Sequence, residues 1–171
     1  ETLGAVYLPF FGSSAEQVDG DFAKVSASFL RVNRDPDLLA QKFYGHFFRQ
    51  EPDLQSLFLG NLTAQGRMLT AALKLSVDNL RTPERLLPYL EELGKRHAHY
   101  GVQPRHLTIM GRSLQDAIGE LDDEWSDSTA RAWSKAYSHI AQALQRGGDR
   151  RLDVGPVKAV ARAAQVGGHR A

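Results

Sequence analysis

The stretch EELGKRHAHYGVQP, Glu91–Pro104, places a histidine at the end of an apolar helical face. Leu86, Leu90, Leu93 and His97 follow one another at intervals of four, three and four residues. Residues at this spacing share one face of an α-helix. The His97 imidazole is therefore expected on the buried side of a helix, in line with three leucines.

A buried imidazole needs a polar or metal partner, and the residues alone leave two possibilities open. In the first, His97 is a structural residue that bonds to a backbone carbonyl. In the second, it is the ligand of a metal in a large flat cofactor, which the leucines would cover. Haem suits such a site, because one axial histidine can hold the iron while apolar walls hold the porphyrin.

Composition limits the classes of function that are open to the chain. Its 171 residues, 42% hydrophobic and 24% charged, suit one folded domain. Since it has no cysteine, it lacks disulfides and thiolate ligands, and any metal needs nitrogen or oxygen donors. A net charge of +1 disfavours nucleic acid as a partner, and no apolar run approaches the roughly 18 to 20 residues of a membrane span. We expect a cytoplasmic protein with no nucleic-acid or membrane partner.

Helical periodicity runs through nearly the whole chain and predicts an all-α fold. An N-terminal extension, residues 1–20, precedes a helical domain at 21–146, and a basic, alanine-rich tail or linker follows at 147–171. The first helix is expected to bury Phe29 and Leu30 on one face. The expected helices cover residues 21–32, 37–50, 52–58, 63–80, 84–97, 104–120, 128–144 and 156–166.

Four segments resemble, in order and spacing, the bacterial globins of the flavohaemoglobin and single-domain haemoglobin group. They are FYGHFFRQEPDLQSLF, AQGRMLTAAL, LGKRHAHYGVQPRHLTIMGRSLQDAI and AWSKAYSHIAQAL. The resemblance covers about residues 22–146. It implies a globin fold of six to eight helices in a three-over-three sandwich around haem b, iron protoporphyrin IX. It also favours the second possibility for His97, that of the proximal iron ligand.

On the other side of the haem, individual residues of this chain match family positions. Phe58 matches the phenylalanine that wedges the haem, and Tyr44 matches the tyrosine that donates a hydrogen bond to bound oxygen. Gln65 matches the residue that reaches over the ligand, with Leu69 as the apolar contact beside it. Tyr44 and Gln65 are therefore the expected catalytic pair, each hydrogen bond contributing about 1.5 to 3 kcal/mol. The expected haem contacts are His97, Phe58, Tyr44, Gln65, Leu69, Phe43, Val102 and Leu93.

The chain departs from the flavohaemoglobin pattern on the proximal side. There the family has a tyrosine and a glutamate that hydrogen-bond the ligand histidine, and this chain has Leu107 and Gly148. Without a carboxylate partner, His97 is expected to be a less basic ligand. The carbonyl of Leu93 is the expected acceptor of its other ring proton.

Two functions from different classes follow from the resemblance. In the first, the chain is the haem module of a nitric oxide dioxygenase that binds O2, NO and CO and depends on a reductase domain or partner with FAD and NAD(P)H. In the second, it is a non-catalytic haem protein that stores or transports oxygen, or senses gas and signals through its termini to a partner. An all-α interaction bundle without a cofactor is a distant third.

Overall fold

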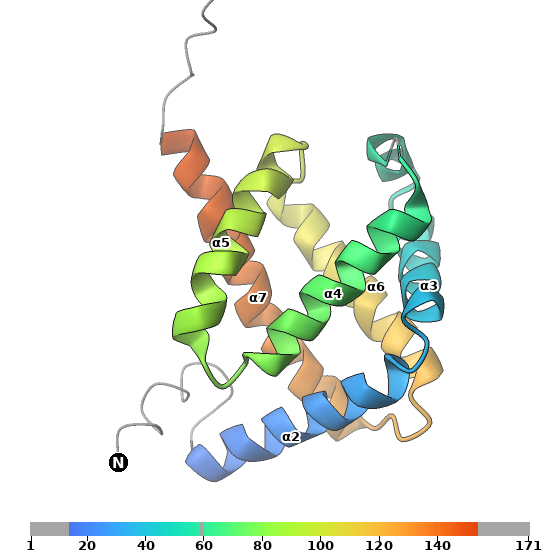
Figure 1. The fold of residues 1–171 in the computed structure, drawn as a ribbon, viewed down its shortest axis with the longest axis vertical. Helices are drawn as coiled ribbons and strands as arrows, with labels where there is room; N and C mark the ends of the chain where they lie inside the picture. The colour runs from blue at the N-terminus through green and yellow to red at the C-terminus, as the bar shows by residue number, and fades with distance from the viewer. Residues whose placement is uncertain (1–13, 59, 154–171) are drawn as a thin grey trace, which may run out of the picture.

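The computed structural model describes residues 14–58 and 60–153, and these form helices joined by short loops (Figure 1). The all-α prediction is confirmed for this part of the chain. None of the described helices combines the length and apolarity needed to cross a membrane. The elements are α2 (Ala15–Val32), α3 (Pro36–Gln50), the 3-10 helix η1 (Pro52–Leu57), α4 (Leu62–Asp78), α5 (Pro83–His99), α6 (Pro104–Leu121) and α7 (Asp127–Asp153).

Side-chain caps explain where several helices begin. The Ser14 hydroxyl accepts a hydrogen bond from the Gln17 N–H at 3.2 Å, at the start of α2. Asp35 accepts one from the Leu38 N–H at 2.9 Å, at the start of α3. Each cap satisfies a backbone donor that has no partner within the helix. The α2 helix consequently starts at Ala15, six residues before the expected start at Asp21.

The prediction also differs from the structure at the end of α7. The α7 helix continues to Asp153, beyond the expected end at Leu144. The expected helix at 156–166 lies outside the described residues. The division of the chain at residues 20 and 146 stays a prediction.

One expected core residue is exposed. Leu30 is 71% exposed, whereas Phe29 is 3% exposed. The buried residues of α2 include Phe22, Val25, Phe29 and Val32, which follow a strict alternation of three and four. Leu30 falls one residue outside that stripe, which turns it about 100° around the helix axis.

A buried polar network ties α2 to the α6–α7 connection and to α7. Arg31 donates two hydrogen bonds to Asp122, at 2.5 and 3.0 Å, and the Trp133 indole N–H donates to the Ser28 hydroxyl at 3.0 Å. Burial raises the pKa of Asp122, but bonds donated by Arg31, Ser28 and the Glu124 N–H outweigh it. The pKa of Asp122 therefore lies below its ordinary value of 3.8.

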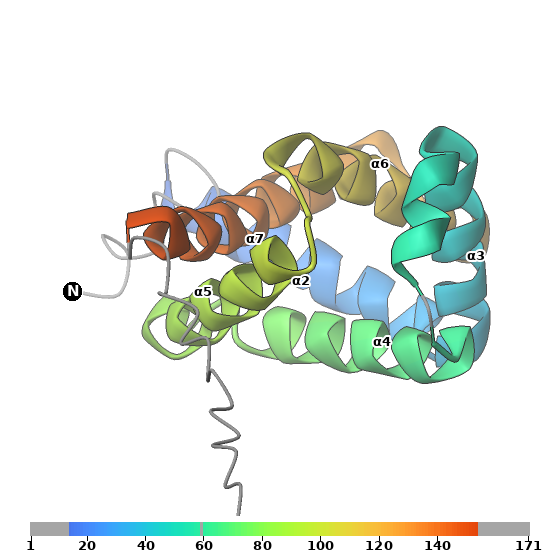
Figure 2. The ribbon, with the colours of Figure 1, turned by 90° about the horizontal axis from the view of Figure 1, so that it is seen from above.

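Helices α5 and α7 cross unusually closely, and this crossing positions the segment that carries His97. A Cβ on Gly94 of α5 would overlap the backbone of Leu144, and one on Gly147 of α7 would overlap the backbone of Glu91. Two glycines therefore let the two backbones touch. Figure 2 shows α5 lying along α7 on one side of the molecule, with α3 closing the other end.

Candidate haem-binding site

The geometry of His97 leaves one ring nitrogen available. Its Nδ1 lies 2.8 Å from the carbonyl oxygen of Leu93, and because a carbonyl only accepts, Nδ1 carries the proton. This confirms the expected Leu93 acceptor. Nε2 then presents a lone pair, and no described residue bonds to it. The two possibilities for His97 are thus compatible, because the carbonyl bond orients the ring and leaves the metal-binding atom free.

The electrostatics keep this imidazole neutral. Burial is the largest influence and lowers the pKa of His97. The Leu93 carbonyl acts in the opposite direction, while the charge of Arg96 lowers the pKa further. A neutral imidazole is the form that binds a metal ion.

The turn after α5 fixes the approach to α6. Gly101 has a φ of 86°, in the left-handed region that favours glycine. The Val102 N–H donates to the His97 carbonyl at 3.0 Å across this turn. Val102 is half-buried and packs against the core just beyond the histidine.

Tyr44 lies in an aromatic cluster formed by α3 and the residue after η1. Its ring centroid is 5.1 Å from Phe43, 5.5 Å from Phe48 and 5.4 Å from Phe58. No described residue bonds to its hydroxyl. Burial raises the pKa of Tyr44 to about 12, so the hydroxyl stays protonated at neutral pH and can donate a hydrogen bond. These three ring contacts restrict the position of the donor.

Gln65 and Leu69 lie one turn apart on α4, and both are half-buried. The neighbouring Gly66 is buried, and a Cβ there would come within 2.8 Å of the Ala40 Cβ on α3. Ala40 is one turn before Tyr44 on the same helix. The close crossing at Gly66 therefore places Gln65 and Tyr44 on adjoining parts of α4 and α3. The Gln65 side-chain amide, like the Tyr44 hydroxyl, has no partner among the described residues.

The predicted residues thus fall into two groups on different helices. The distal group lies on α3, α4 and the residue after η1, and the proximal group on α5 and the turn that follows it. α5 packs mainly on α7, and α4 packs mainly on α3. Figure 2 shows α5 and α3 on opposite sides of the molecule, with α4 running between them. Of the expected contacts, Phe43 is 3% exposed and forms part of the core behind Tyr44.

Positions 107 and 148, where the resemblance implies a tyrosine and a glutamate, carry a leucine and a glycine. Leu107 is buried, and its carbonyl accepts a hydrogen bond from the Tyr137 hydroxyl at 2.6 Å. A Cβ on Gly148 would lie 3.4 Å from the Ala98 Cβ, in ordinary contact distance. Position 148 therefore faces the end of α5 next to His97 and carries no side chain there.

Sequence reasoning missed one buried histidine. His106 is 4% exposed, and its Nδ1 accepts a hydrogen bond from the Gln103 N–H at 3.0 Å. Its Nε2 is buried without a partner among the described residues. The signal was its position two residues after Pro104, where a side chain can cap the start of a helix. His99, by contrast, is exposed, as its position two residues after His97 predicts.

The donor set fits haem better than a protein-bound metal ion. Within the described ranges, no cluster of three or more histidine, cysteine or acidic side chains could hold a metal. One neutral imidazole amid apolar and aromatic side chains is the donor set of an iron that a porphyrin holds by its other four ligands.

An all-α fold in which a helix turns an imidazole with a free ring nitrogen toward apolar side chains is typical of the helical haem proteins. The chain belongs to the globin family, because the family model described as Globin matches residues 41–144. Membership in this family implies haem as the cofactor and small gases as its ligands.

The chain is similar to flavohemoproteins in its sequence. It is 32% identical to the flavohemoprotein of Rhizobium meliloti (strain 1021) over 112 residues and 29% identical to that of Bacillus subtilis (strain 168) over 114 residues. These matches cover 62% and 63% of this chain, but 27% and 28% of the two relatives. The chain therefore matches only about a quarter of the length of these relatives.

Solved structures confirm the globin fold. A bacterial globin from Campylobacter jejuni superposes with a TM-score of 0.70 at 21% identity, covering 79% of this chain and 99% of that one. A flavohemoglobin from Malassezia yamatoensis, solved with bound FAD and heme, gives a TM-score of 0.66 at 21% identity. The superposition covers 78% of this chain and 37% of that one. At these identities the likeness concerns the fold alone.

Proposed function

We propose that the chain is an oxygen-binding globin domain in which His97 is the axial ligand of haem b. The observation that carries the proposal is the 2.8 Å bond between His97 Nδ1 and the Leu93 carbonyl, which leaves Nε2 free and neutral. Phe58, Leu69 and Val102 are half-buried apolar side chains that would hold the porphyrin. Phe43 on α3 and Leu93 on α5 would support them from opposite sides of the site.

The chain's own part in the chemistry is to supply hydrogen-bond donors on the distal side. Haem supplies the iron that binds O2, NO or CO and takes part in electron transfer. Tyr44 and Gln65 have side-chain donors that no described residue occupies, so these donors are free to stabilise a polar ligand. Bound O2 draws negative charge toward itself and gains more from such donors than CO does.

We infer that the biological reaction is nitric oxide dioxygenation. In this reaction NO and O2 combine with one electron to give nitrate, NO3−. The similarity to flavohemoproteins supports this function, since relatives of that name are matched over their globin portion. Continued turnover needs one electron per cycle, which we assign to a reductase domain or partner that carries FAD and takes electrons from NAD(P)H.

A second function, oxygen storage or gas sensing without catalysis, is favoured by the proximal side. His97 donates to a neutral backbone carbonyl, and Gly148 supplies no carboxylate beside it. A less basic axial ligand donates less electron density to the iron and therefore supports oxygen-bond chemistry less well.

Sustained turnover separates the two functions. The haem-loaded chain is mixed with O2, NADPH and a flavin-containing reductase, NO is added repeatedly, and nitrate is measured against haem. The dioxygenase function predicts many equivalents of nitrate per haem and a large loss in Tyr44→Phe. One equivalent of nitrate, with no further turnover despite continued reduction of the haem, would contradict it and support the non-catalytic function.

A further inference from the structure

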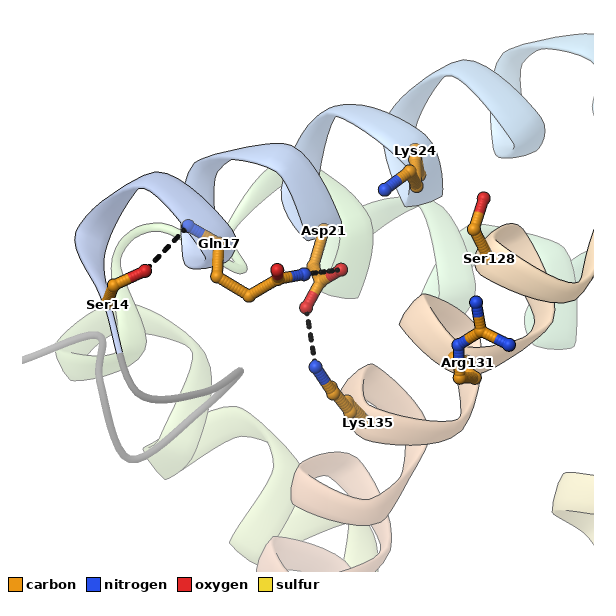
Figure 3. Close-up of a pocket in the computed structure, with 7 residues that line it drawn as sticks. All are labelled: Ser14, Gln17, Asp21, Lys24, Ser128, Arg131 and Lys135. Carbon is orange, nitrogen blue, oxygen red and sulfur yellow. Dashed lines mark hydrogen bonds and ion pairs between the residues drawn. The ribbon is translucent and has the colours of Figure 1, made fainter.

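A second site lies between the first half of α2 and the start of α7, and it shares no residue with the candidate haem site. It is a polar cavity of about 540 Å³ (Figure 3). This volume falls within the range of small-molecule sites, which is about 300 to 1,000 Å³. The lining residues are Ser14, Gln17, Asp21, Lys24, Ser128, Arg131 and Lys135.

Asp21, the one carboxylate among the described lining residues, is already satisfied. Asp21 is 3% exposed, and it accepts hydrogen bonds from the Gln17 amide at 3.0 Å and from the Lys135 ammonium at 2.9 Å. A buried carboxylate held by two donors is a fixed part of the wall. It also neutralises Lys135 and leaves that side chain anchored at the edge of the cavity.

Two further cations have no such partner. Lys24 on α2 is half-buried, Arg131 on α7 is exposed, and no described residue pairs with either. Among the described lining residues, these two cations and Lys135 give three positive charges against the one negative charge of Asp21. Figure 3 shows Lys24 on one helix and Arg131 on the other, bordering the same hollow.

Hydroxyl groups complete the set of donors. Ser128 lies on the first turn of α7, three residues before Arg131. Its hydroxyl is 3.1 Å from that of Ser126. Ser14 lies at the opposite end of the cavity, where its hydroxyl caps α2. Both hydroxyls belong to side chains that line the cavity, and a serine hydroxyl can donate one bond while accepting others.

We propose that this cavity binds a soluble phosphorylated compound that carries at least two phosphate groups. Unpaired cations and hydroxyl donors recognise phosphate oxygens, and the planar arginine fork matches phosphate with two parallel bonds. An apolar ligand finds little apolar surface here, and a metal cation would meet net positive charge. The cavity extends well beyond the size of a single phosphate, so a diphosphate or a nucleotide uses donors at both ends.

Calorimetric titration of the haem-loaded chain at low ionic strength tests the proposal, with orthophosphate, pyrophosphate and ATP as probes. Pyrophosphate and ATP should bind saturably and more tightly than orthophosphate. Arg131→Gln and Lys24→Gln should each weaken binding by about tenfold, because each removes a charge-assisted bond. Arg112→Gln removes the same charge from an exposed position on α6 outside the cavity, and should leave affinity nearly unchanged.

Three results would overturn the proposal. The first is the absence of saturable binding of pyrophosphate and ATP. The second is equal weakening by Arg112→Gln, which would show that general surface charge attracts the probes. The third is binding to vesicles that contain phosphatidylglycerol but not to either soluble probe, which would identify a lipid headgroup as the ligand. The haem absorption spectrum of each variant confirms that the fold is intact.

Discussion

Replacement of Tyr44 by phenylalanine tests the distal half of the proposed site. The variant removes one hydroxyl and keeps the ring that contacts Phe43, Phe48 and Phe58. Since no described residue bonds to that hydroxyl, its loss breaks no bond within the described part of the chain. The free energy of unfolding should therefore change by no more than about 0.5 kcal/mol.

The effect on oxygen should be much larger. A hydrogen bond to a partly charged acceptor contributes about 1.5 to 3 kcal/mol, and a change of about 1.36 kcal/mol in a barrier changes a rate tenfold. Tyr44→Phe should thus release O2 roughly 10 to 150 times faster. The effect should persist across the neutral range, because burial raises the pKa of Tyr44 to about 12 and the hydroxyl does not ionise there. CO release should change far less, since bound CO carries little negative charge.

Stopped-flow or flash-photolysis measurements of O2 and CO release give the comparison directly. Tyr100→Phe is the matched control, because Tyr100 is 67% exposed and removal of its hydroxyl should leave both rates unchanged. An O2 release rate in Tyr44→Phe that equals the wild-type rate would refute the assignment of Tyr44 as a donor to the ligand.

Three further predictions concern stability and the proximal side. Gly94→Ala should lower the free energy of unfolding by about 1 to 3 kcal/mol in urea titration, because its Cβ would overlap the Leu144 backbone. As a control, Gly20→Ala should raise the free energy of unfolding by about 0.5 to 1 kcal/mol, because nothing lies within 4 Å of the added Cβ. Equal effects of Gly94→Ala and Gly20→Ala would argue against the close crossing of α5 and α7. The pKa of Asp122 is lower in the folded state, so the unfolded chain binds more protons in acid. The loss of unfolding free energy in Asp122→Asn should therefore be largest above the ordinary pKa of 3.8 and should shrink as the pH falls below it. A loss that does not depend on pH would contradict this. Gly148→Glu should raise the iron–histidine stretching frequency in resonance Raman spectra by placing a carboxylate beside the proximal imidazole, whereas an unchanged frequency would show that position 148 does not reach it.

Much of the fold could be predicted from periodicity. The stripe from Leu86 to His97 identified α5 and its inward face, and the carbonyl of Leu93 proved to be the ring's hydrogen-bond acceptor. The reason is that both features are local, because residues three and four apart on a helix are neighbours whatever the rest of the chain does. Leu30 was misplaced because its neighbour Phe29 already occupied the inward stripe.

The features that sequence could not predict depend on pairs of distant segments. Nothing in the local pattern of Gly94 shows that it meets Leu144, and Asp21 gives no local sign of its bond to Lys135. The burial of His106 is of the same kind, since its exposure depends on what packs over the start of α6. Helix crossings and long-range ion pairs follow from tertiary packing, which periodicity does not encode.

Titration of the His97→Gly variant with haemin, followed by its Soret absorption, shows whether His97 binds haem iron. His99→Gly, which removes an exposed imidazole two residues away, serves as the control and should match the wild type. His97→Gly should bind haemin far more weakly and with an altered spectrum, and added free imidazole should restore the wild-type spectrum. Wild-type affinity and an unaltered spectrum in His97→Gly would contradict the account.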